Sequence, residues 1–181
     1  MSGSQTLSYS GFSKLLHWMM ALMIFGLVAV GLYMAELPDD APNRAQLYGM
    51  HKSMGVLLLI LLLVRLAWLR IRPAPALPEA FAAKERLVIK GVQAALYLLM
   101  ALLPISGYLM STAAGYPVTF FGLFKLPALV GESKELAGFA KEMHELGGYA
   151  TILFVLLHMI GAVKHRLKDK GGPTDILQRM L

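Results

Sequence analysis

Long stretches without charged residues are the feature that most constrains this sequence. Three of them occupy positions 15–35, 91–124 and 146–163. A helix that crosses a lipid bilayer needs about 20 apolar residues, with a range of about 17–25. Each stretch is therefore long enough to supply one membrane span.

A fourth stretch is shorter and needs a separate argument. Residues 53–64 are uncharged, but Lys52 and Arg65 bracket them. Positions 57–63 are all Leu or Ile, and long basic side chains near a helix end can reach the membrane surface. We therefore predict a span here too.

These stretches predict an all-α integral membrane protein, a four-helix transmembrane bundle forming a single domain over residues 1–181. The chain is 57% hydrophobic and 15% charged, whereas soluble domains are roughly 45–50% apolar and about 25% charged. The first apolar stretch is too long for the core of a cleaved signal peptide, about 7–15 residues. The predicted helices span residues of about 13–35, 47–69, 88–112 and 142–166.

The basic residues predict the orientation of the bundle. Twelve of the seventeen Lys and Arg residues fall before the first span, between positions 65 and 90, or after the fourth span. By the positive-inside rule, both termini and the 65–90 loop are cytoplasmic. We thus expect a multi-pass protein of the bacterial inner membrane, with lipid and not nucleic acid around it. The tail from Lys168 onward is expected to be a short solvated or interfacial extension.

Four histidines lie at two depths in the predicted spans. His17 lies one turn inside the first helix from the cytoplasmic side, and His158 lies at a similar depth in the fourth. His51 and His144 lie near the opposite side. His144 and His158 are about four helical turns apart, roughly 21 Å along one face of a helix. Because the chain has no cysteine, covalent haem attachment, iron–sulfur clusters and thiolate zinc sites are excluded.

The two histidine pairs suit the two axial positions of haem iron, one pair at each level. Zinc would need three or four ligands around one point. Any one of these histidines alone would equally suit an ordinary packing role. Arg65, about four helical turns after His51, lies on the same helix face at the inner level and could bind a haem propionate. The alternative is an arginine that snorkels to the membrane surface.

Short motifs accompany these residues. They are Lys14-x-x-His17-Trp18, His51-x-Ser53-x-Gly55, Val64-Arg65-Leu66, Tyr97-Leu98-Leu99, Leu103-Pro104-x-x-Gly107, His144-Glu145 and Leu157-His158. Over residues of about 7–180 the chain resembles the bacterial cytochrome b561 family, dihaem cytochromes of the inner membrane. The resemblance implies two haem b groups, with His17 paired with His158 and His51 paired with His144 as iron ligands.

The resemblance also implies electron transfer to or from the quinone pool, and some similar proteins are superoxide oxidases. That activity would make the chain a superoxide:ubiquinone oxidoreductase, with ubiquinone as electron acceptor. Lys52 and Lys141 are the candidate residues for superoxide on the outer side. Lys164 and His165 are the candidates for quinone at the inner rim, although an ordinary interfacial role for His165 stays open. The alternative is a cytochrome b membrane-anchor subunit of a dehydrogenase or hydrogenase.

Overall fold

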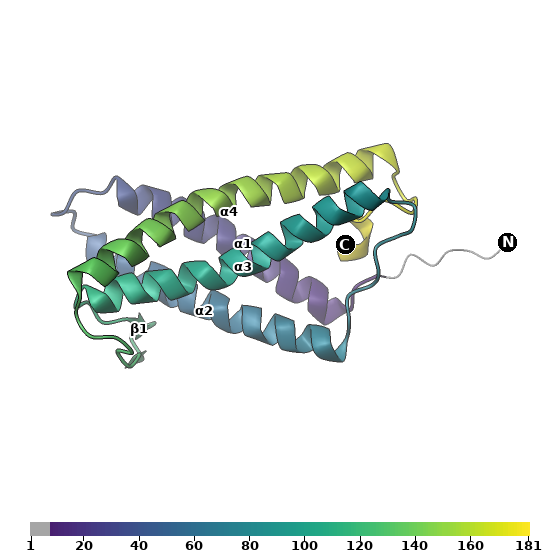
Figure 1. Ribbon diagram of the computed structural model, residues 1–181. Coiled ribbons are helices and arrows are strands. Elements are labelled where there is room, and N and C mark those ends of the chain that lie inside the picture. The colour runs from purple at the N-terminus through teal and green to yellow at the C-terminus, as the bar shows by residue number, and fades with distance from the viewer. Residues whose placement is uncertain (1–7) are drawn as a thin grey trace.

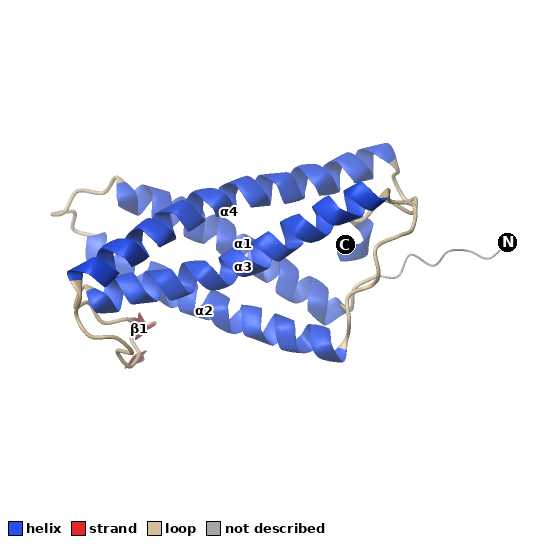
Figure 2. Ribbon diagram, in the orientation of Figure 1, coloured by secondary structure: helices blue, strands red, loops and turns tan. Residues whose placement is uncertain are grey.

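A computed structural model describes residues 8–181 and contains four long helices (Figure 1). The elements in chain order are α1 Gly11–Ala35, α2 Arg44–Ile71, α3 Ala83–Ala113, β1 Thr119–Phe120, β2 Phe124–Lys125, α4 Lys134–Lys168 and the 3₁₀ turn η1 Gln178–Met180. Loops make up the rest of the described chain (Figure 2). The predicted domain includes residues 1–7, which lie outside the described part.

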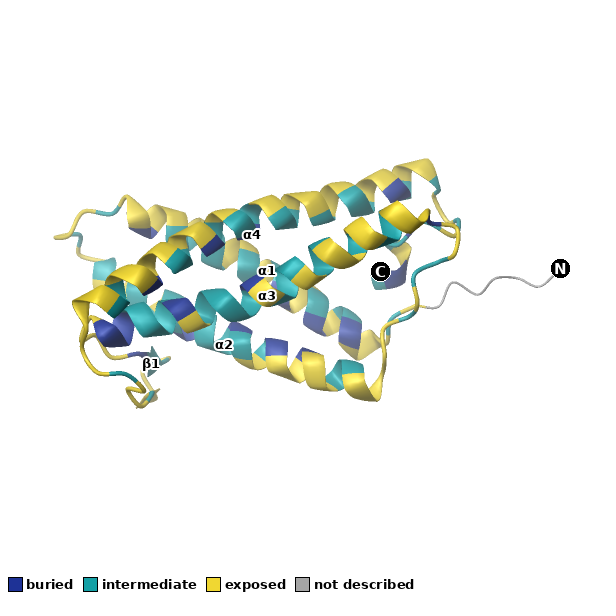
Figure 3. Ribbon diagram, viewed as in Figure 1, coloured by how far each residue is buried: buried dark blue, intermediate teal, exposed yellow. Residues whose placement is uncertain are grey.

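The prediction of an all-α, four-helix transmembrane bundle is confirmed. All four helices are long and apolar enough to cross a membrane. Few side chains are buried between them, and the small core is formed by Met20, Leu58 and Leu62. The outward faces of the helices are exposed (Figure 3) and carry large apolar side chains such as Leu22 and Leu63. Lipid, which is as apolar as these side chains, is the solvent that suits such faces.

The helices do not pack equally against one another. α3 packs most extensively on α4, α1 packs on α2, and α2 packs on α3, whereas α1 and α4 make almost no direct backbone contact over the described residues. The start of α1 and the end of α4 lie at the same end of the bundle (Figure 1). We call this end, which also holds the 65–90 region, the basic end. The opposite end, with the α1–α2 connection and the β1–β2 hairpin, is the loop end.

All four helices begin earlier than the hydropathy predicts, α3 and α4 by the most. α4 starts at Lys134 rather than at about residue 142, and α3 starts at Ala83 rather than at about residue 88. The Ser133 hydroxyl accepts a hydrogen bond from the Leu136 amide at 3.2 Å, which caps α4. The Glu85 carboxylate accepts one from the Ala82 amide at 3.1 Å. Such polar caps satisfy the free amides of a first turn, so the helices extend beyond their apolar stretches.

For the tail, the sequence allows a solvated or an interfacial extension, and the structure does not show a freely solvated one. Residues 169–181, the C-terminal hook, fold back onto the basic end. The Asp175 side chain is buried and accepts hydrogen bonds from Arg166 Nη1 at 2.7 Å and from the Gly171 amide at 2.9 Å. The indole nitrogen of Trp18 donates to the Met180 carbonyl at 2.9 Å. Hydrogen bonds to α1 and α4 thus hold the hook against the basic end, although several of its residues stay exposed.

Candidate functional site

The first histidine pair lies in the half of the bundle near the basic end. His17 of α1 and His158 of α4 have ring centroids 6.1 Å apart, with ring planes at 57°. These two helices otherwise hardly touch. The histidine rings therefore face each other across a place where the backbones stay apart.

The second pair lies in the half near the loop end. His51 of α2 and His144 of α4 also have ring centroids 6.1 Å apart, with planes at 75°. α4 thus supplies one ring to each pair, and α1 and α2 supply the partners. The structure brings together the same pairs that share a depth in the sequence.

The spacing of the rings suits one metal ion between the members of each pair. An imidazole nitrogen binds a transition metal at about 2.0 Å, and the ring centroid lies about 1.1 Å behind that nitrogen. Two rings on opposite sides of one ion would then have centroids roughly 6.2 Å apart, against the observed 6.1 Å. Over residues 8–181 no three or more His, Cys, Asp or Glu side chains gather as a metal site. Each pair can therefore give two ligands, which leaves the others to a group such as a porphyrin.

His144 is oriented by its surroundings. Its Nδ1 lies 2.9 Å from the Leu103 carbonyl oxygen and 3.2 Å from the Ser106 hydroxyl. Because a carbonyl only accepts, Nδ1 carries the proton and Nε2 keeps its lone pair for a metal. A Cβ atom at Gly107 would lie 3.0 Å from Cε1 of the ring. Glycine at this position therefore gives the imidazole the space it needs against α3.

His51 has a less complete environment. A Cβ atom at Gly31 of α1 would lie 3.4 Å from Cε1 of His51, so α1 passes close to this ring. The Nδ1 atom of His51 is buried and has no hydrogen-bond partner in the described part of the chain. A buried polar nitrogen without a partner costs free energy, and a metal bound at Nδ1 itself would remove that cost.

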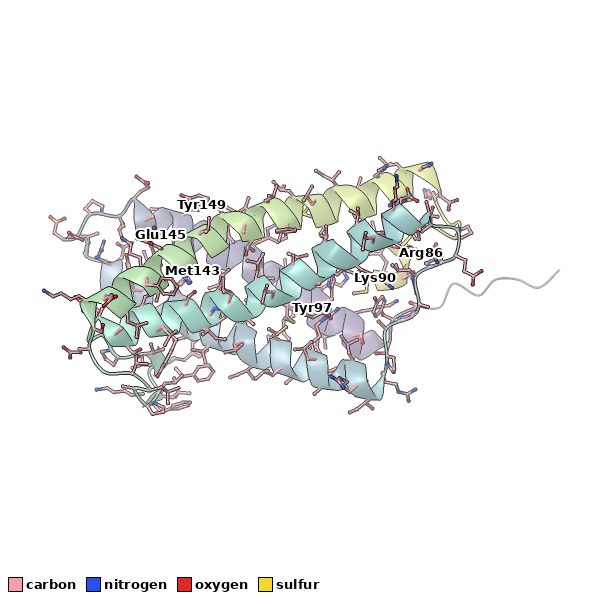
Figure 4. The ribbon with its side chains drawn as sticks, viewed as in Figure 1. Arg86, Lys90, Tyr97, Met143, Glu145 and Tyr149 are labelled. Carbon is pink, nitrogen blue, oxygen red and sulfur yellow. The ribbon has the colours of Figure 1, made fainter. Side chains whose placement is uncertain are left out.

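Arg65 turns into the bundle rather than out to the surface. Its side chain is buried. Nε donates to the Tyr97 hydroxyl at 2.9 Å, and Nη1 donates to the Ser13 carbonyl at 2.9 Å. Tyr97 lies on α3 toward the basic end (Figure 4). Arg65 thereby joins α1, α2 and α3 on the His17–His158 side, and the snorkelling alternative does not describe its position.

Lys52 and Lys141, the lysines proposed for the outer side, both have partners. Lys52 Nζ donates to the Ser111 hydroxyl and to the Pro117 carbonyl, each at 3.1 Å. Lys141 Nζ lies 3.6 Å from a carboxylate oxygen of Glu145 in an exposed pair. Glu145 lies on α4 near the loop end (Figure 4). The two lysines therefore contact different parts of the chain, Lys52 the end of α3 and the α3–α4 connection, and Lys141 its own helix.

The two inner candidates, Lys164 and His165, differ in their exposure. His165 is buried, and its ring packs edge-on against Phe81 at 4.9 Å. Its Nδ1 is buried without a partner among the residues described. Lys164 is exposed. His165 lies in the last turn of α4, at the end of the bundle that the sequence predicts, but the loop that contains Phe81 covers its ring.

Three contacts escaped the sequence analysis. Tyr97 and Ser13 hold Arg65. The contact with Tyr97 could have been suspected, because Tyr97 brings a hydroxyl into an uncharged stretch of the sequence. Trp18 lies edge-on against His17 with ring centroids 5.3 Å apart. Its bond to Met180 links the C-terminal hook to this ring. No local pattern in the sequence predicts that link.

Comparison with known proteins agrees with this architecture. Residues 8–181 match the family described as prokaryotic cytochrome b561. The chain is 35% identical to cytochrome b561 homolog 2 of Escherichia coli strain K12 over 175 residues, which is 96% of this chain and 90% of that protein. Membership implies haem b binding and a role in electron transfer. The chain belongs to the prokaryotic cytochrome b561 family and is a multi-pass bacterial membrane protein.

Proposed function

We propose that the chain holds two haem b groups and transfers electrons across the bacterial inner membrane. His17 and His158 would bind one haem iron, and His51 and His144 the other. The observation that carries this proposal is the equal 6.1 Å separation of two histidine pairs at two levels of one bundle. When bound, haem b supplies reversible one-electron oxidation and reduction at its iron.

The residues of the chain hold and orient these groups. The Leu103 carbonyl keeps His144 in the tautomer that leaves Nε2 free, as carbonyl partners commonly do for metal-binding histidines. Arg65 places a permanent positive charge near the His17–His158 pair, where it would bind a propionate. The surrounding helices exclude water, which strengthens that electrostatic attraction.

We propose ubiquinone as the electron acceptor, at the basic end of the bundle. The excess of Lys and Arg at this end favours a cytoplasmic location. Reduction of one quinone to the quinol takes two electrons and two protons. His165 lies seven residues from His158 on the same helix, and an imidazole can both carry and release a proton, so it is our candidate proton donor. Lys164, exposed beside it, is the candidate for binding the quinone carbonyl.

Superoxide is our proposed electron donor at the loop end. Two superoxide anions each lose one electron to become O₂, and the two electrons reduce one quinone. Lys52 and Lys141 are the proposed attracting cations. Because Lys52 is engaged with Ser111 and Pro117 and Lys141 with Glu145, we expect only weak steering of the anion, with a modest dependence on salt.

The first test is the haem content of the purified protein. Two haems per chain, all extractable with acid acetone, are expected, and His17→Ala and His51→Ala should each remove one. One haem per chain in the unaltered protein would contradict the two-site proposal. Stopped-flow mixing with superoxide then tests the donor: rapid haem reduction supports it. No reduction, together with a dehydrogenase or hydrogenase subunit that co-purifies, would support the membrane-anchor alternative instead.

A further inference from the structure

The connection between α3 and α4 carries an exposed apolar hairpin. β1 and β2 pair antiparallel, with Phe120 opposite Phe124. Residues 115–124 include no charged side chain. Leu123 is 77% exposed and Phe124 is 58% exposed. Three phenylalanines pack ring to ring here, Phe120 with Phe121 at 4.8 Å and Phe120 with Phe124 at 5.5 Å.

The turn of this hairpin is held in an uncommon conformation by α2. Phe121 has φ of 49° and is followed by Gly122 at 74°. A bulky residue rarely adopts positive φ, and surrounding contacts must stabilise it there. The Ser53 hydroxyl supplies them, because it accepts from the Phe121 amide at 3.0 Å and lies 3.0 Å from the Thr119 carbonyl. The position of the turn is therefore determined by a buried side chain of a membrane span.

These contacts place the hairpin beside the bundle rather than beyond it. Ser53 lies nine residues after the first residue of α2, about 13 Å along the helix axis. The turn thus lies at the level of His51, next to Met50, which is half exposed on the same helix. Figure 1 shows the hairpin folded back alongside the first turns of α2. The exposed Phe and Leu side chains continue the apolar surface of the spans.

We propose that the tip of the hairpin, residues 121–124, inserts into the lipid of the membrane leaflet at the loop end. The hairpin packs on α2, which carries exposed apolar side chains of its own, and aromatic side chains favour the membrane interface. Lys125 follows directly and suits the phosphate layer above the tip. A second copy of the chain is the competing occupant. The position of the turn favours lipid, because Ser53, which holds it, opens the uncharged stretch of α2, and the exposed tip carries only apolar side chains.

The absence of cysteine from the sequence allows a direct test by site-directed spin labelling. A nitroxide is placed at Leu123→Cys in the haem-loaded protein in lipid nanodiscs, and its collisions with oxygen and with a water-soluble nickel chelate are measured. Asp40→Cys, in the α1–α2 connection, provides the water control. Leu63→Cys, exposed within the uncharged stretch of α2, provides the lipid control.

A label at position 123 that oxygen reaches several-fold better than the nickel chelate, as at position 63, supports insertion. Nickel access equal to that at position 40 would overturn the proposal. Low access of both reagents to the label would also overturn it. Spin–spin broadening that disappears on dilution with unlabelled chains would then identify a second copy of the chain as the occupant. None of these readouts depends on haem chemistry, so the result is independent of the proposed function.

A second variant tests the role of Ser53. Ser53→Ala removes the hydroxyl that holds Phe121, and we expect the label at position 123 to become more mobile and its oxygen-to-nickel ratio to fall. Thr112→Ala is the matched control, because this buried hydroxyl bonds only within α3, to the Tyr108 and Leu109 carbonyls. Equal spectra for both variants would show that Ser53 does not position the hairpin.

Discussion

Gly107→Ala tests how closely α3 must approach the His51–His144 pair. The added Cβ would lie 3.0 Å from Cε1 and 3.2 Å from Nδ1 of His144. Carbon atoms in contact prefer a separation of about 3.5–4.0 Å, so the ring must move by roughly 0.5 Å. His144 is also held at Nδ1 by the Leu103 carbonyl, and a movement of that size would strain both the hydrogen bond and the proposed bond to iron.

The expected magnitude follows from the cost of overpacking. Inserting one carbon into a packed site costs about 1–3 kcal/mol, which corresponds to a loss of haem affinity of about five- to 150-fold. The helix itself should not suffer, because alanine is favoured over glycine in a helix interior by about 1 kcal/mol. The variant should therefore fold, keep the haem of the His17–His158 pair, and lose or weaken the other.

The assay is haem content by the pyridine haemochromogen method, together with a redox titration of each haem. Gly91→Ala is the matched control, because it lies on the same helix and its Cβ would meet nothing within 4 Å. Full haem content and unchanged midpoint potentials in Gly107→Ala would refute the reasoning that α3 and His144 leave no room for a methyl group.

Four further substitutions have expected outcomes. Arg65→Leu removes a buried positive charge near the His17–His158 pair and should lower one midpoint potential by on the order of 59 mV, the one-electron equivalent of a tenfold change in equilibrium. Midpoint potentials unchanged from those of the unaltered protein would contradict that placement. His165→Ala should leave both haem spectra intact and slow reoxidation by quinone in stopped-flow traces, whereas full-rate reoxidation would place the quinone elsewhere. Trp18→Phe removes the donor to Met180 and should speed amide hydrogen exchange in the hook, and unchanged exchange would show that this bond does not hold it. Burial raises the pKa of Asp175, but hydrogen bonds from the Gly171 amide, the Arg166 side chain and the Gln178 amide lower it more, so the net pKa is below the ordinary value. The hook should stay docked above the ordinary carboxyl pKa and be released as the pH falls through the lowered one; proteolysis of the tail measures this, and Asp175→Asn should abolish the pH dependence.

The number and type of membrane helices could be predicted from the sequence because both depend on local quantities. Span length follows from the helical rise of about 1.5 Å per residue and the thickness of the bilayer. The depth of each histidine follows from counting residues along a helix, and the spacing of about four turns from His144 to His158 places both on one face. The two ring pairs lie at the levels that this count predicts. Each depth holds only two of these four histidines, so each histidine has one possible partner at its depth.

Only the tertiary structure decided how the helices rotate and what covers their ends. Arg65 faces inward because Tyr97 and Ser13, which are 32 and 52 residues away from it in the sequence, supply acceptors. His165 is buried because the loop carrying Phe81 lies over it, and Lys52 is engaged because the hairpin connection returns to α2. These contacts join segments that are distant along the chain, whereas hydropathy and periodicity report only on neighbours. Their outcome depends on which helices pack together, and the folded bundle alone determines that.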